Sequence, residues 1–135
     1  MLRHRLLLGG RDPHNIMVVR LDLDYIQKSG DGDKVQLRFI NMLFSRLHLA
    51  VEARYDGEAF LTGLESIYTH RSDQEVTTIC NLDMWTYLKI LIKAKNVNVI
   101  FVLDEADYVV TAGVGKYLRP LSLEFAKNIC FILIT

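Results

Sequence analysis

The stretch NVIFVLDEADYVV, residues 98–110, decides how this chain is expected to fold. It is continuously apolar from Val99 to Leu103, with β-branched and aromatic side chains, and two acids, Asp104 and Glu105, follow at once. A short apolar run of this kind is typical of a strand that is buried on both faces, as in a parallel sheet. The rest of the chain indicates why such a strand should end in two carboxylates.

Two further stretches have the same character. They are IMVVRLDL, residues 16–23, and ICFILIT, residues 129–135, so that with VNVIFVL, residues 97–103, the sequence predicts three strands. Strands that alternate with helices are typical of an α/β fold, in which right-handed crossovers connect parallel strands. We therefore expect a parallel sheet that carries helices on both of its faces.

Between the strands, apolar residues recur at intervals of three and four, which is the spacing of one face of a helix. We expect four helices, at 33–49 with a cap at Asp33, at 58–69, at 82–95 with a cap at Asn81, and at 117–127 with Pro120 in the first turn. The residues expected on the buried side of the first are Val35, Phe39, Ile40, Leu43, Phe44 and Leu47. Those expected on the buried side of the third are Leu82, Trp85, Leu88, Leu91 and Ile92.

Polar segments separate these elements. Residues 27–33 and 52–58 contain glycine and predict loops, and residues 70–75 predict a looser connection. Residues 2–8, LRHRLLL, have the pattern of a helix that stops at Gly9-Gly10. Because an interior parallel strand normally continues into a loop and a further helix, we expect residues 1–135 to form one partial domain.

Composition limits the classes of function. The 135 residues are 50% hydrophobic with two prolines, which favours one globular domain. Lys plus Arg and Asp plus Glu both number 16, so no overall basic field draws the chain to nucleic acid or to an anionic membrane. No apolar run reaches the roughly 18 residues of a membrane helix, and the first ten residues do not form a signal peptide.

Cysteines and histidines give no metal signal in the sequence. Cys80 and Cys130 form no CxxC pair, so neither a disulfide framework nor a zinc site is predicted, and a reducing compartment fits best. The four histidines share no metal-ligand spacing, and we expect each to be solvated or part of the core. They are His4, His14, His48 and His70.

The two acids after the apolar strand lie where α/β sheets bind ligands, at the carboxyl end of the strand. An Asp there can hold Mg²⁺ through water, and the next acid can orient or deprotonate a water that attacks a phosphate. The alternative is structural, because acids after a buried strand also cap the following helix. Asp22 and Asp24 at the end of the first strand and Thr135 at the end of the last favour the functional interpretation.

A second glycine-containing stretch imitates a phosphate loop. Residues 113–116 read Gly-Val-Gly-Lys, like the end of the pattern GxxxxGK[ST]. Position 110 is Val where the pattern needs Gly, Tyr117 stands where it needs Ser or Thr, and no strand precedes the stretch directly. We interpret it as an ordinary loop, so residues 1–135 contain no phosphate loop.

The order of these elements resembles the core of the AAA+ ATPases, which are three-layer domains of the P-loop NTPase fold, and the resemblance covers nearly all of the chain. Three segments are similar to origin recognition complex subunits, the subunit-four branch most of all, although that branch has an apolar or aromatic residue in place of Ala106. The segments are residues 18–47, FVLDEADYV at 101–109 and KYLRPLSLEFAKNICFILIT at 116–135. The resemblance implies that the first strand and the phosphate loop lie upstream of Met1, and the lid and last strand beyond Thr135.

The same resemblance implies roles for individual residues. Asp104 would hold Mg²⁺ through water, Glu105 would position the attacking water, and Thr135 would stand at or next to the position that reads the γ-phosphate. The cofactors would be ATP and Mg²⁺ in the complete protein. This chain alone is expected neither to bind nucleotide tightly nor to hydrolyse it, because two acids without a phosphate loop repel a triphosphate.

The resemblance also implies a biological setting, which is the nucleus, or alternatively the cytoplasm. The partners would be other origin recognition complex or AAA+ subunits and double-stranded DNA, in an assembly that initiates replication and helps load the replicative helicase; no membrane is expected. Two alternatives stay open. One is another AAA+ or signalling ATPase that hydrolyses ATP when complete, and the other is a non-catalytic interaction module.

Overall fold

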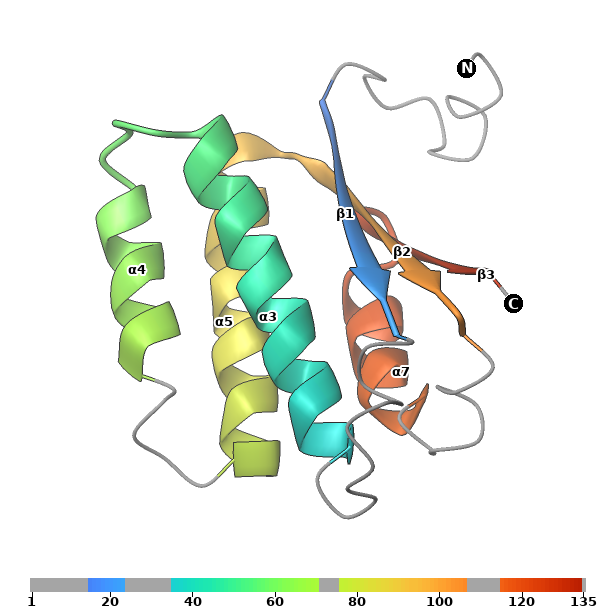
Figure 1. Cartoon of the computed structure of the whole chain (residues 1–135). Coiled ribbons are helices and arrows are strands. Elements are labelled where there is room, and N and C mark those ends of the chain that lie inside the picture. The colour runs from blue at the N-terminus through green and yellow to red at the C-terminus, as the bar shows by residue number, and fades with distance from the viewer. Residues whose placement is uncertain (1–14, 24–34, 71–75, 107–114, 135) are drawn as a thin grey trace.

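A parallel sheet of three strands forms one layer of the computed structural model, which describes residues 15–23, 35–70, 76–106 and 115–134 (Figure 1). The strands are β1 (Ile16–Asp22), β2 (Asn98–Asp104) and β3 (Ile129–Ile134). Their order in the sheet is β1-β2-β3, with both neighbouring pairs parallel. The three predicted strands and the α/β class are confirmed, with ends within one residue of the predicted ones.

Alternation along the strands gives the sheet two different faces. On β1, Met17, Val19 and Leu21 are buried, whereas Val18 and Arg20 between them are exposed. The buried face continues across β2 and β3, where the rings of Phe101 and Phe131 stack with centroids 5.1 Å apart. This face is the one that packs against the helices.

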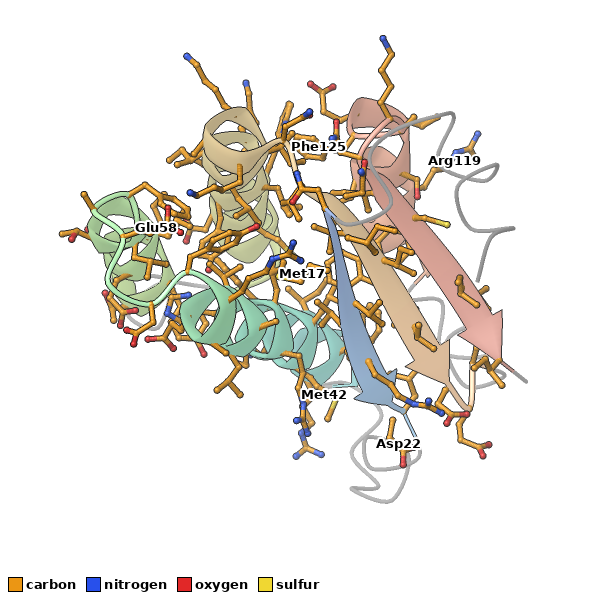
Figure 2. All side chains as sticks on the ribbon, turned by 90° about the horizontal axis from the view of Figure 1, so that it is seen from above. Met17, Asp22, Met42, Glu58, Arg119 and Phe125 are labelled. Atoms are coloured by element: carbon orange, nitrogen blue, oxygen red, sulfur yellow. The ribbon has the colours of Figure 1, made fainter. Side chains whose placement is uncertain are left out.

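The described helices all lie on that one face (Figures 1 and 2). They are α3 (Val35–Arg54), α4 (Leu61–His70), α5 (Val76–Lys95) and α7 (Gly115–Glu124). The expectation of helices on both faces is therefore wrong for the described part of the chain. The physical reason is the strand order: both crossovers advance in the same direction along the sheet, and crossovers of one hand then fall on one side.

Helix ends differ from the predicted ones in several places. Helix α5 begins at Val76, so Asn81 lies inside it and is not its cap, and α3 continues to Arg54, which shortens the predicted loop 52–58 from its start. Helix α7 begins at Gly115, which places Pro120 beyond the first turn. Asp33, the segments 2–10, 27–33 and 71–75, and Gly113-Val114 lie outside the described residues.

The core joins the buried face of the sheet to the apolar stripes of α3 and α5. The predicted stripe of α3 is confirmed wherever its side chains are described, at 0 to 1% exposure for Phe39, Ile40, Leu43, Phe44 and Leu47. On α5, Leu88 and Leu91 are buried as predicted, but Leu82 and Trp85 are 53% and 37% exposed. The buried side carries Met84 and Tyr87 instead, because α5 packs against both α3 and α4 and is rotated toward that pair. Among the described helices, none is long and apolar enough to cross a membrane.

Candidate functional site

The carboxyl ends of the strands lie together at one edge of the sheet, and the predicted acids lie there. The register aligns Asp22 at the end of β1 with Asp104 on β2 and Ile134 on β3. Figure 2 shows Asp22 at this end of β1. The predicted position of Asp104 and Glu105 at the carboxyl end of the middle strand is confirmed, whereas Asp24 and Thr135 lie outside the described residues.

Asp104 is held by two hydrogen bonds on its carboxylate. Arg20 Nη2 donates to Oδ2 at 2.7 Å, and the backbone N–H of Glu105 donates to Oδ1 at 3.0 Å. The hydrogen bond from Arg20 is the main reason that the pKa of Asp104 lies below its usual value. Arg20 and Asp104 both project from the face of the sheet that the described helices leave uncovered. The side chain of Arg20 is 65% exposed and that of Asp104 is 29% exposed.

Glu105 begins the turn that leaves β2, and its backbone is unusual. Its φ is 61°, in the left-handed region that residues other than glycine seldom adopt. The neighbouring strands fix this turn, since Leu23 N–H donates to Asp104 O at 3.0 Å and Ala106 N–H donates to Ile134 O at 2.8 Å. Left-handed residues of this kind gather at functional sites and at sharp turns, where the surrounding structure determines them.

The described residues supply only part of a magnesium site at this edge. Carboxylate oxygens are the ligands that Mg²⁺ prefers, and Asp104 has a partly exposed one, which suits a metal held through water. Arg20, however, places a positive charge against the same oxygen, so it would have to turn outward to admit the ion. Among the described residues, Asp22, Asp104 and Glu105 do not form a three-residue cluster of metal-ligand type.

A second polar cluster lies between α3, α4 and α5, and the sequence did not predict it. His48 is 3% exposed, and its Nε2 lies 2.6 Å from Glu65 Oε2 and 3.6 Å from Glu52 Oε1. Its Nδ1 lies 2.6 Å from the hydroxyl of Tyr87, and its ring stacks on Tyr68 with centroids 4.1 Å apart. The only sequence signal was the four-residue spacing of His48 and Glu52, which also occurs on ordinary solvated helices.

Arg20 was likewise missed as a partner of Asp104. The two residues are 84 positions apart, and only the register of β1 on β2 brings them together.

Comparison of the chain with protein-family models, with curated proteins and with solved structures finds no match in any of the three. The AAA+ and origin recognition complex resemblance therefore stays a prediction.

Proposed function

We propose that this chain is part of an AAA+ nucleotide-binding domain, and that it belongs to a subunit of an origin recognition complex-like initiator. The observation that carries the proposal is the position of Asp104-Glu105. An apolar strand flanked by parallel neighbours on both sides ends in two acids, at the edge where α/β sheets bind ligands. The order β1-β2-β3 is also the order that consecutive crossovers along such a sheet produce.

In the complete protein, ATP with Mg²⁺ would supply the phosphoryl group and the charge that stabilises its transfer. Asp104 would contribute one carboxylate to a water of the metal, after its hydrogen bond to Arg20 has opened. Glu105, which is exposed at the turn after β2, would orient the attacking water. Thr135, outside the described residues, would contact the γ-phosphate, and the phosphate loop would come from sequence before Met1.

The proposed partners are other AAA+ subunits and double-stranded DNA in the nucleus. With 16 basic and 16 acidic residues, the chain has no overall positive field of its own. Contact with DNA would therefore depend on local basic residues or on the other subunits of the assembly. Such an assembly would bind origin DNA and help load the replicative helicase.

The Arg20–Asp104 ion pair favours a second candidate, which is a non-catalytic interaction module. In that case the carboxylate of Asp104 serves only to tie β1 to β2 and to fix the turn at Glu105. The surface offered to a partner would then include the sheet face that the described helices leave uncovered, where Val18 is 58% exposed.

One experiment separates the two candidates. ATP turnover is measured with the full-length protein that contains this chain, assembled with its copurifying partners. The wild type is compared with Glu105→Gln. Removal of a water-activating acid should lower turnover by about 100-fold or more. Glu124→Gln, which changes an exposed acid at the end of α7, is the matched control and should leave turnover unchanged. Equal turnover in the wild type and in Glu105→Gln would contradict the catalytic role and leave the interaction module.

A further inference from the structure

His48, Glu52 and Glu65 bring three groups of metal-ligand type to one point. Their ligand atoms lie within 4.8 Å of one another, and they come from two helices, since His48 and Glu52 are one turn apart on α3 and Glu65 is on α4. The helix backbone presents His48 and Glu52 on the same side, because residues four apart are neighbours on a helix surface.

The imidazole of His48 is fixed before any ligand arrives. Tyr87 Oη lies 2.6 Å from Nδ1, and the ring of Tyr68 stacks on the imidazole at an interplanar angle of 15°. Histidines that bind metals usually make a hydrogen bond with the nitrogen that faces away from the ion, and this bond sets the ring orientation. Here that arrangement leaves Nε2 directed at the two carboxylates.

The spacing of the ligand atoms is close to that of a tetrahedral metal. Bonds of about 2.0 to 2.2 Å to nitrogen and oxygen place tetrahedral ligands about 3.3 to 3.6 Å apart. Nε2 and Glu52 Oε1 are 3.6 Å apart, near that value, while Nε2 and Glu65 Oε2 are 2.6 Å apart, which is a hydrogen-bond distance. Both glutamate side chains are 50% exposed, so Glu65 can retreat by the roughly 0.7 to 1.0 Å that an ion needs when it replaces the shared proton.

The carboxylates also face open surface. Glu52 and Glu65 line a shallow depression together with Thr62, Ser66 and Thr69. A water molecule or an exogenous ligand can therefore reach a fourth coordination position from the solvent side. His48, at 3% exposure, closes the opposite side.

We propose that His48, Glu52 and Glu65 bind one divalent transition-metal ion, for which Zn²⁺ is the best match. A set of one imidazole and two carboxylates suits Zn²⁺ and its neighbours better than Mg²⁺ or Ca²⁺, which prefer oxygen ligands alone. Two carboxylates also neutralise the charge of the ion. This site is independent of Asp104 and Glu105, since it lies between the helices and away from the sheet edge.

The test is a calorimetric titration of Zn²⁺ into the tag-free, metal-stripped chain. A second titration uses Co²⁺, because the visible absorption bands of bound Co²⁺ reveal tetrahedral coordination. The wild type should bind one equivalent of Zn²⁺. Glu52→Gln and Glu65→Gln should each weaken binding by at least about tenfold, and the amide of the latter can still bond to His48, so folding is retained. Glu124→Gln should bind as the wild type does.

Three outcomes would overturn the site: no saturable binding to the wild type, binding in both glutamate variants as tight as in the wild type, or a loss of binding in Glu124→Gln as large as in the glutamate variants. Circular dichroism of each variant checks that lost binding does not arise from unfolding. A change in the nitrogen chemical shift of His48 Nε2 on addition of one equivalent of Zn²⁺ would support direct ligation. An unchanged shift with bound Zn²⁺ would place the ion elsewhere and also overturn the assignment.

Discussion

Replacing Tyr87 with Phe isolates the energy of one buried hydrogen bond. Tyr87 is fully buried, and its ring packs edge-on against Phe44 with centroids 5.1 Å apart. Burial is the main reason that its pKa is raised, so the hydroxyl stays protonated throughout the pH range in which proteins are handled. The Phe ring keeps the packing and loses only the contact to His48 Nδ1 at 2.6 Å.

The loss of unfolding free energy expected for Tyr87→Phe follows from the buried His48 Nδ1 that the substitution leaves without a partner. His48 is 3% exposed, so its Nδ1 loses a partner that water cannot easily replace. Leaving a buried polar atom without a partner costs about 1 to 3 kcal/mol of unfolding free energy. For a chain of 135 residues, each kcal/mol lowers the melting temperature by about 4 °C, so Tyr87→Phe should melt about 4 to 12 °C below the wild type.

Tyr68→Phe is the matched control. It removes a hydroxyl from the other tyrosine of the same cluster, but that hydroxyl donates to Ser45 Oγ at 2.9 Å in a half-buried position where water can compensate. We expect it to cost about 0.5 to 1 kcal/mol. Urea unfolding followed by circular dichroism measures both, with unchanged dependence on urea as evidence of a constant unfolded state. A Tyr87→Phe cost equal to or below that of Tyr68→Phe would refute the reasoning.

Two further predictions concern the sheet. Arg20→Ala should raise the pKa of Asp104 toward its ordinary value, as read from carboxyl chemical shifts against pH. Because the pKa of Asp104 is depressed in the folded state, its stabilisation of the fold is present above the unfolded pKa near 4 and is lost as pH falls through the folded pKa. Arg20→Ala should therefore weaken the loss of stability in acid. An Asp104 titration that is the same in both proteins would contradict the ion pair. Ile132 on β3 is apolar and 39% exposed, so we expect the isolated chain to self-associate in sedimentation velocity and Ile132→Lys to reduce this association. The control Leu49→Lys, at a site 60% exposed on α3, should leave the association unchanged. A monomeric wild type would overturn this expectation.

Some of this structure could be predicted from sequence because its signal is local. The strands are short and mainly apolar, and the stripe of α3 is a regular pattern; the structure confirms both. The start of α5 was missed because Asn81 resembles a cap although helical residues precede it. Leu82 and Trp85 fit the spacing of a buried helix stripe, yet only the packing of α5 between its neighbours decides which residues turn inward. That the described helices leave one face of the sheet uncovered follows from strand order, which no single segment reports.

In the candidate site, too, the residues that could be predicted are those whose signal is local in the sequence. Asp104 and Glu105 could be placed at the end of β2, because an apolar run and two acids are adjacent in sequence. Arg20 could not, because its contact depends on the register of strands that are far apart in the chain. His48 could not either, since its partners come from three helices whose packing the sequence does not state.

The constant direction of the strand crossovers has a consequence for synthesis. Ile16 pairs with Asn98, so β1 must wait for about 80 further residues before it has a neighbour. At a synthesis rate of about 5 to 20 residues per second, that wait lasts several seconds. During it, α3 is the described element already made that covers the apolar face of β1, and the edge of β1 that later pairs with β2 is open to other chains. The ribosome-bound chain therefore carries an unpaired apolar strand for that time, which favours association with other chains.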